Sequence, residues 1–495
     1  MHAARRFYTE HTYEIVLFSI LLAAFFLRFF DLTNRFGLAY DQARDLLVAG
    51  YALSELKFPL IGPFASAGQF VYGPQWYWFL MGFLAITPGF FLGPWVLLGV
   101  LYCLCVFLMM KTGEMIGGKT LAVIVGVLIA VSPGAIAQSL NLSSPSMVGV
   151  LSLVSIFFFV RYLKKQKMRD GFFLAFIIGT AIMVHFQAIG LVSLLIAGGI
   201  LGKRSIKYVL LLLGGFMLPF LPLIYFDFTN NFFESRNVLD YYLTGRHRIQ
   251  YSNRWLTYIT VFWPNSWARI TGGQLLLGYV GFFSVFLIAL RSFIREKTNK
   301  IVLGLSSVFI VNFMVLRYYN GEVFDSYLVF LHGIILLMTS LLILYLYRIK
   351  RFIGIIVLAL FVLGSLQIVY SEAKGSENTT YQRSARVSLV LEQEFPGKAF
   401  SVYDYKYMSP QVSLPIALYL RHQGLLSDSG QRIGITGHVQ AASMSAHPII
   451  DPALDVAVLD LSSSKSADLM DAGWGRVNSP DVHRTTVLWY TYQKQ

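Results

Sequence analysis

Two carboxylates and a guanidinium stand together in the segment Tyr40-Asp41-Gln42-Ala43-Arg44-Asp45, directly after the first apolar run of the chain. On a helix, Asp41, Arg44 and Asp45 occupy positions i, i+3 and i+4 and share one face. Charges beside lipid cost free energy unless they face water, one another or a ligand, which favours a functional interpretation. A carboxylate can accept a proton from an attacking hydroxyl, and a guanidinium can bind an anionic leaving group. A helix-end salt bridge without chemistry is the alternative.

The composition places these charges in a membrane protein. The 495 residues are 56% hydrophobic and only 13% charged, and the mean hydropathy is +0.60. These values predict a polytopic α-helical membrane protein rather than a soluble one. The formal net charge of +14 does not indicate nucleic acid, because the basic residues form short clusters between apolar runs. Such clusters retain loops in the cytoplasm, so we expect no nucleic-acid partner.

Basic clusters and apolar runs together predict the topology. Placing the clusters in the cytoplasm requires one net crossing within residues 75–110 and gives about eleven transmembrane helices. The chain then begins inside, and its first span is retained, because no small-residue cleavage site follows it. The loops 31–74 and 228–271 and the tail fall outside. We therefore expect the outer face to carry the function.

The tail differs in composition from the rest of the chain. Strand-like stretches at 399–405, 432–436, 456–461 and 485–492 alternate with helical candidates at 410–424 and 466–472, which predicts a small α/β domain. We thus expect a transmembrane domain at 1–370 and an extracytoplasmic α/β domain at 371–495. Asn378-Thr379-Thr380 matches a glycosylation sequon, although three residues are not specific. The role of this domain is not given by the sequence.

The first outer loop carries the motifs of a known family. Asp41 is followed by Leu60-Ile61-Gly62-Pro63 and then by Tyr72-Gly73-Pro74 before an aromatic-rich second apolar segment. This order resembles the polyprenyl-phosphate-sugar-dependent membrane glycosyltransferases of the GT-C superfamily, on the side of family 39. That family includes the protein O-mannosyltransferases and the lipid A aminoarabinose transferases. The resemblance is good over about residues 14–200, looser to residue 370, and only architectural in the tail.

The resemblance implies a GT-C-like fold and an inverting glycosyltransferase of the bacterial inner membrane. Such an enzyme moves a sugar from an undecaprenyl-phosphate carrier to an acceptor hydroxyl on a lipid, glycan or protein at the outer face. Its partners are the polyprenyl-phosphate sugar donor, membrane lipid and the acceptor. The sugar, the acceptor and the oligomeric state are not given by the sequence.

The chemistry of this transfer assigns roles to the acidic segment. General-base help from a carboxylate is worth about 10²–10⁴-fold, and an arginine offers bidentate donors to a departing phosphate. We therefore assign Asp41 as the catalytic base or acceptor-orienting group and Arg44 to the donor phosphate. Asp45 either orients Arg44 or helps to hold a divalent cation, so no cofactor is certain.

Two departures from the family pattern bear on the phosphate. Gln42 stands where a Glu is usual, and Gly73 stands where some members carry a phosphate-contacting Lys. Phosphate binding must then rely more on Arg44 or on another basic residue. The second outer loop supplies Arg246 and Arg248 for this role, among aromatic residues that more commonly anchor a chain at the membrane interface.

Other polar residues at the outer face are assigned to the substrate pocket together with Asp45, namely Tyr72, His185, Gln187 and Asp227. For the last, and for the histidine, a cap or turn role is the alternative. Two other classes of protein compete with the enzyme. A transporter or lipid-linked-glycan flippase usually has internal repeats and polar residues near the bilayer midplane, which we do not find. A non-catalytic assembly or sensor protein accounts for the tail but not for the acidic segment.

Overall fold

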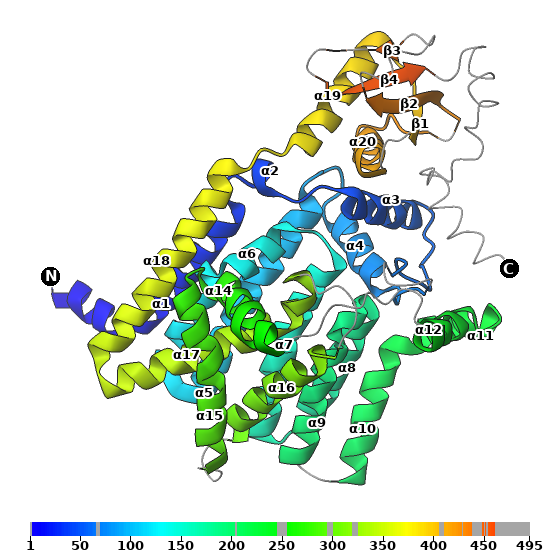
Figure 1. The fold of residues 1–495 in the computed structure, drawn as a ribbon. Helices are drawn as coiled ribbons and strands as arrows, with labels where there is room; N and C mark the ends of the chain where they lie inside the picture. Colours follow the sequence, from blue (N-terminus) through cyan, green and yellow to red (C-terminus); the bar gives the residue numbers. More distant parts are fainter. Residues whose placement is uncertain are drawn as a thin grey trace. The chain divides into compact units, whose positions relative to one another are not determined.

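The computed structural model is mostly helical (Figure 1). It describes residues 2–65, 70–202, 205–244, 255–294, 300–318, 325–404, 410–427, 429–437, 448–449, 451 and 454–460. The chain divides into two compact units. The first comprises Met1–Leu32, Leu60–Trp76 and Trp95–Ser376, and the second comprises Thr33–Pro59, Tyr77–Pro94 and Glu377–Gln495.

The chain is a multi-pass membrane protein. Among the described residues, seven helical segments have the length and composition to cross a membrane: His11–Phe29, Gly93–Val131, Ser144–Lys165, Ile206–Thr229, Leu275–Ile294, Ser326–Ile349 and Arg351–Glu394. The same part of the chain holds three shorter apolar helical segments, namely Gln75–Ile86, Phe186–Leu201 and Lys300–Leu316. The predicted number of about eleven therefore exceeds the seven that meet this criterion, and the orientation in the membrane stays a prediction.

Residues 75–110 hold one long helix and one short helix. Helix α4 (Gln75–Ile86) has 12 residues, which at 1.5 Å per residue is about 18 Å and too short for a hydrocarbon core of about 30 Å. Helix α5 (Gly93–Val131) is long enough, and it is interrupted at Gly118, where φ is 78°. The interruption falls in the stretch Lys111–Lys119, which is one of the basic clusters that we expect in the cytoplasm. These lengths agree with a single net crossing in this stretch.

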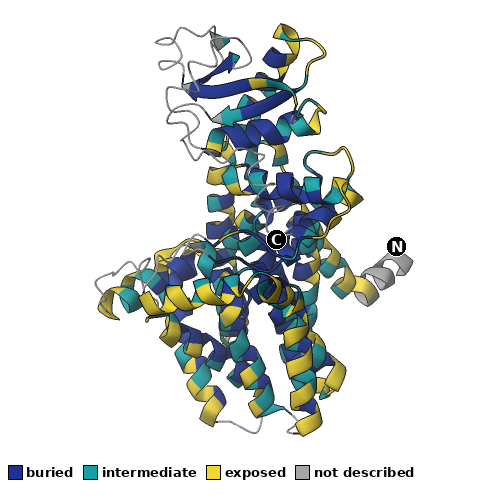
Figure 2. Cartoon of the chain, turned by 90° about the vertical axis from the view of Figure 1, so that its right-hand side faces the viewer, coloured by how far each residue is buried: buried dark blue, intermediate teal, exposed yellow. Residues whose placement is uncertain are grey.

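The helices that follow build the rest of the first unit. They are α6 (Pro133–Leu140), α7 (Ser144–Lys165), α8 (Met168–Val184), α9 (Val192–Leu201), α10 (Ile206–Met217), α11 (Leu221–Thr229), α12 (Phe233–Thr244), α14 (Trp263–Thr271), α15 (Leu275–Ile294), α16 (Lys300–Leu316), α17 (Val329–Ile349) and α18 (Arg351–Gly375). Helix α17 is the most enclosed, because it packs against α7, α15 and α18. Figure 2 shows buried residues where the helices of this unit face one another. Apolar side chains on α10 and α11, by contrast, are exposed, as expected of a lipid-facing surface.

A buried arginine holds the first helix of this unit, α1 (His2–Phe29). Arg28 is only 1% exposed, and its guanidinium donates to the carbonyls of Ala24, Ile129 and Ala130 at 3.0–3.2 Å. The last two belong to the final turn of α5, whose carbonyls have no partner within the helix. A cation at a helix C-terminus also complements the helix dipole. Arg28 therefore joins α1 to the end of α5.

The described part of the tail forms a small sheet with helices within the second unit. The strands are β1 (Phe400–Asp404), β2 (Gln431–Gly437), β3 (Pro448–Ile449) and β4 (Val456–Asp460), in the sheet order β1-β2-β4-β3. The first pair is parallel, and β4 runs antiparallel to both neighbours. The buried residues of the sheet are 400–402 of β1, 433–436 of β2 and 456–459 of β4, and Figure 2 shows the buried colour on these strands. Three predicted strands and the helix predicted at 410–424 are confirmed, while 466–472 and 485–492 lie outside the described residues.

Two helices of the tail pack in this unit, and one of them also contacts a helix from much earlier in the chain. Helix α19 (Thr379–Glu394) packs against α20 (Pro410–His422), and α20 packs against both β1 and α3 (Tyr40–Ser54). The second unit thus includes the helix that carries Asp41. The predicted domain boundary at residue 370 falls inside α18.

The predicted sequon is a helix cap. Asn378 is 8% exposed and precedes α19, where its Oδ1 accepts a hydrogen bond from the Tyr381 N–H at 3.1 Å. Its Nδ2 donates to the Phe36 carbonyl at 2.8 Å. The oxygen and the nitrogen of the Asn378 amide therefore both form hydrogen bonds within the fold. The cap accounts for an asparagine at this position without glycosylation.

Candidate active site

The acidic segment forms the first turns of α3. Gln42 is 7% exposed, and its Oε1 accepts a hydrogen bond from the Ala39 N–H at 3.0 Å. Three residues into a helix, a Glu or Gln side chain that reaches back to the cap residue satisfies a donor that the helix leaves open. Gln42 therefore fills a capping position in which either residue type serves, and this explains its departure from the family pattern.

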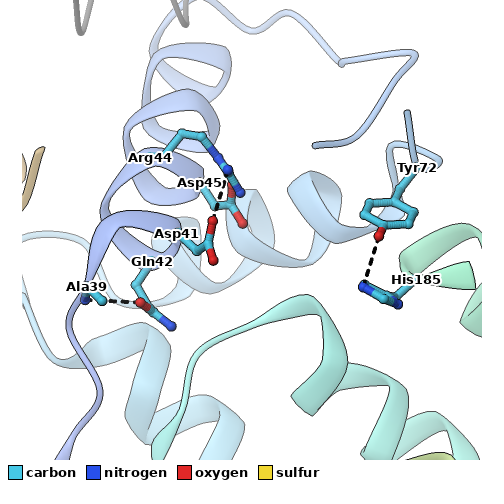
Figure 3. A network of polar contacts seen from close by, with 7 residues as sticks. All are labelled: Ala39, Asp41, Gln42, Arg44, Asp45, Tyr72 and His185. Atoms are coloured by element: carbon cyan, nitrogen blue, oxygen red, sulfur yellow. Dashed lines mark hydrogen bonds and ion pairs between the residues drawn. The ribbon is translucent and has the colours of Figure 1, made fainter. Parts of the chain in front are cut away.

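Arg44 connects both carboxylates of the segment. Its Nη1 lies 2.9 Å from the Asp41 Oδ1, and its Nε and Nη2 each lie 2.8 Å from the Asp45 Oδ1. Figure 3 shows the arginine reaching toward both side chains. The two carboxylates differ in exposure, because the Asp41 side chain is 65% exposed and the Asp45 side chain is only 5% exposed. Asp41 is thus the carboxylate of the pair that solvent or a substrate can reach.

The electrostatics of the cluster keep Arg44 charged. Burial alone lowers the pKa of Arg44, but Asp45, Tyr77 and Asp41 together raise that pKa above its ordinary value. The guanidinium also lies over the Tyr40 ring, 5.1 Å from its centroid. Asp45 contacts Arg44 through two nitrogens, which agrees with the orienting role, and the choice between its two predicted roles stays a prediction.

A divalent cation does not fit this cluster as it stands. Asp41 and Asp45 share one guanidinium, and a metal ion bound by both would have to displace or face that positive charge. Within the described part of the chain, no three His, Cys, Asp or Glu side chains come together as ligands. We therefore derive no step through a metal.

The two motifs after α3 pair with each other in the first unit. Gly62 donates from its N–H to the Tyr72 carbonyl at 2.8 Å, and the Tyr72 N–H donates to Pro63 at 3.0 Å. Phe64 and Val71 complete this short antiparallel pair. The sequence spacing between the Gly-Pro and Tyr-Gly-Pro motifs thus reflects a hairpin-like approach of the two segments.

Close packing explains the glycines of the pair. A Cβ on Gly62 would lie 2.2 Å from the Gly73 carbonyl oxygen. A Cβ on Gly73 would lie 2.4 Å from the Gln75 Oε1 and 2.7 Å from the Met183 Cβ, and the Gly73 N–H donates to the Met183 carbonyl. The position therefore has no room for the lysine that some family members carry.

Tyr72 and His185 form a second polar contact, which Figure 3 also shows. The Tyr72 hydroxyl lies 3.0 Å from the His185 Nε2, and the two rings stack with centroids 4.5 Å apart. The His185 Nδ1 accepts from the Gln187 N–H at 3.3 Å, so the ring proton belongs on Nε2, which donates to the tyrosine oxygen. His185 is thus a neutral imidazole that orients Tyr72.

Aromatic side chains enclose this contact within the first unit. Phe70 and Phe186 pack with centroids 5.7 Å apart, and Tyr241 of α12 lies 5.3 Å from Phe70. The side-chain amide of Gln187 is buried here and has no hydrogen-bond partner among the described residues. A buried amide without a partner costs free energy unless a ligand or water satisfies it.

Asp227 has a structural role in the same unit. Its Oδ1 accepts from the N–H groups of Glu234 and Ser235 at 2.7 and 3.1 Å, and its Oδ2 accepts from the Ser235 hydroxyl. These are the contacts of a cap at the start of α12. Of the two interpretations left open by the sequence, the contacts therefore favour the cap.

Glu234 was not predicted as part of the site. It is 7% exposed, and its Oε2 accepts from the Val71 N–H at 2.9 Å, next to Tyr72. Burial raises the pKa of Glu234 to about 7, an effect that the Val71 N–H opposes and Asp227 reinforces. An acidic residue in a first helical turn is ordinary in sequence, so only the fold reveals its burial.

The structure thus brings the predicted residues into two separate clusters. Asp41, Arg44 and Asp45 lie together in the second unit, and Tyr72, His185 and Gln187 lie together in the first. Arg246 and Arg248 lie outside the described residues.

Three of the solved structures that match this chain show a similar fold. ArnT from Cupriavidus metallidurans in the apo state matches with a TM-score of 0.61 at 10% identity, over 91% of this chain and 98% of that one. ArnT bound to undecaprenyl phosphate matches with a TM-score of 0.59 at 10% identity, over 92% and 99%. The apo oligosaccharyltransferase of Archaeoglobus fulgidus matches with a TM-score of 0.52 at 12% identity, over 83% and 64%.

These matches concern the fold. No protein-family model matches the sequence, and no curated protein matches it significantly. The chain therefore has a GT-C-like fold, similar to the folds of ArnT and of the archaeal oligosaccharyltransferase. Identities of 10–12% carry no residue roles.

Proposed function

We propose that the protein is a polyprenyl-phosphate-sugar-dependent glycosyltransferase of the family 39 type, in the bacterial inner membrane with its tail on the extracytoplasmic side. It moves one sugar from undecaprenyl phosphate to an acceptor hydroxyl on a lipid, glycan or protein. The observation that carries the proposal is an exposed carboxylate, Asp41, held by Arg44 at the start of α3. The similarity to ArnT, which was solved with undecaprenyl phosphate bound, supports the class of donor.

The reaction proceeds in one displacement. The acceptor oxygen attacks the anomeric carbon while Asp41 takes its proton, and the bond from that carbon to the phosphate oxygen breaks. The bonding electrons leave with the polyprenyl phosphate, so the anomeric configuration inverts. Arg44 fixes the direction of the Asp41 side chain through the 2.9 Å ion pair, and correct orientation is a large part of such catalysis.

The phosphate requires cationic donors as it gains charge. All three nitrogens of the Arg44 guanidinium contact carboxylates, so we assign Arg44 first to Asp41 and only second to the phosphate. Arg246 and Arg248 are the further proposed phosphate contacts. Tyr72, His185 and Gln187 are proposed to line the donor pocket, where the buried Gln187 amide offers both a donor and an acceptor.

The decisive experiment measures transfer or hydrolysis with a short-chain polyprenyl-phosphate sugar and the purified protein. Asp41→Asn should insert and fold as the wild type does but lose about 10²–10⁴-fold in turnover. Glu55→Gln is the matched control, because Glu55 follows the same helix and its side chain is 52% exposed. Substantial residual turnover in Asp41→Asn would remove Asp41 from the role of base.

A further inference from the structure

The C-terminal domain and the acidic helix belong to the same compact unit. Helix α20 packs with one side toward β1 and with another toward α3, and its residues Ile416, Ala417 and Leu420 are fully buried. A helix buried on several faces transmits the position of one neighbour to another, because close-packed interiors deform little. The position of α3 therefore depends on that of the tail.

The tail contacts the chain just before α3. The Asn378 amide donates to the Phe36 carbonyl at 2.8 Å, and the Phe36 ring packs on Tyr381 with centroids 5.3 Å apart. Phe91, between α4 and α5, joins the same cluster at 5.5 Å from both Tyr381 and Tyr419. These contacts hold the segment that leads into the acidic turn.

The tail also contacts the second half of α3. The Arg421 guanidinium, at the end of α20, lies over the Tyr51 ring at 3.8 Å from its centroid. The glycine at position 50 leaves room for the arginine side chain, because a Cβ there would lie only 3.2 Å from the Arg421 Nε. A cation this close to an aromatic face is attracted by the ring quadrupole. The tail thus contacts both the segment that leads into α3 and the second half of α3 itself.

We propose that the C-terminal domain positions α3 for catalysis and that Arg421 does so through Tyr51. The inference rests on the proposed role of Asp41. Asp41 and Tyr51 lie ten positions apart on the same helix, about 15 Å, so a change of tilt at Tyr51 displaces the carboxylate. A misplacement of about 1 Å can cost about 10²-fold in rate. Arg421 is accordingly a positioning residue, which does not touch the substrate.

The test is a double-mutant cycle read as steady-state kinetics with a short-chain polyprenyl-phosphate sugar. We expect Arg421→Ala to lower kcat about tenfold with the donor KM unchanged. Arg421→Lys keeps a cation over the Tyr51 ring and should retain most of the wild-type kcat. Tyr51→Leu should match Arg421→Ala, whereas Tyr51→Phe keeps the aromatic face and the activity. Because both side chains act through one contact, the double variant Arg421→Ala/Tyr51→Leu should be no slower than the slower single variant.

Arg386→Ala is the matched control. Arg386 pairs with Asp451 inside the tail, so its loss weakens the domain without removing the α3 contact. Equal loss of kcat in Arg386→Ala and Arg421→Ala, additive effects in the cycle, or no effect of Arg421→Ala would each overturn the inference. An active Asp41→Asn enzyme would instead refute the proposed function, so the two failures are distinguishable.

Discussion

The acidic cluster of α3 and the Tyr72 cluster of the first unit are both polar, but they are built in opposite ways. Asp41, Arg44 and Asp45 are charged groups that neighbour one another along a single helix. Tyr72 and His185 are neutral groups brought together from distant parts of the chain and supported by Glu234 through Val71. Charges paired within one helix need little help from the fold, whereas the neutral cluster exists only when several segments pack correctly.

The largest effect should come from breaking the charged cluster. Arg44→Ala leaves Asp45, whose side chain is 5% exposed, without its guanidinium and frees the Asp41 side chain to rotate. We expect kcat to fall about 10²-fold, with donor affinity reduced less than threefold. Equilibrium binding of a short-chain polyprenyl phosphate measures the donor affinity, and steady-state kinetics measure kcat, so the two effects can be compared. A fall in donor affinity as large as that in kcat would instead make Arg44 the principal phosphate contact, as the sequence alone predicted.

A smaller effect should come from the neutral cluster. Tyr72→Phe removes the oxygen that accepts from the His185 Nε2 and leaves a donor unsatisfied, which costs about 1–3 kcal/mol when buried. We expect kcat/KM for the donor to fall about tenfold while the protein remains folded. Tyr241→Phe, which keeps the ring packed on Phe70, is the matched control and should retain activity. Equal losses in the two variants would assign the effect to general packing.

The smallest effect concerns pH and Glu234. Because the pKa of Glu234 is raised to about 7, the folded protein holds this proton more tightly than the unfolded chain does. The associated stability is fully present below about pH 4.5 and is lost as pH rises through about 7. We expect the melting temperature to fall by about 2–4 °C between pH 5 and pH 8 from this group. Glu234→Gln should remove that part of the slope, and an unchanged slope would show that Glu234 ionises normally.

Local patterns predicted the elements that depend on local chemistry. The shared charged face of Asp41, Arg44 and Asp45 and three strands of the tail follow from spacing and alternation within a few residues, whereas the full extent of the helix Tyr40–Ser54 lies in a stretch predicted only as an outer loop. The number of spans does not follow in the same way. Helix α8 has 17 residues and α16 has 17, and an apolar run of this length is shared by short spans and buried helices.

Contacts between distant residues were beyond the sequence. Glu234 is buried beside a hydrogen-bond partner 163 positions away, the Val71 N–H, and that burial raises its pKa although the hydrogen bond itself opposes the rise. Nothing near Glu234 in the sequence indicates this pairing. Arg421 ends α20 with an ordinary basic residue, and only the fold places it on Tyr51. The sequence shows that Gly73 departs from the family pattern. The reason for a glycine there is its close contact with Met183, which lies far away in the sequence.

The shared unit of α3 and the tail limits how this protein can be engineered. A truncation at Glu377 would remove the residues that contact Phe36, Gly50 and Tyr51. The acidic helix α3 of the remaining fragment would then lack the contacts that fix its position. Chimaeras that exchange tails between relatives should therefore exchange residues 33–59 and 77–94 as well. In this protein the module that can be transplanted is discontinuous along the chain.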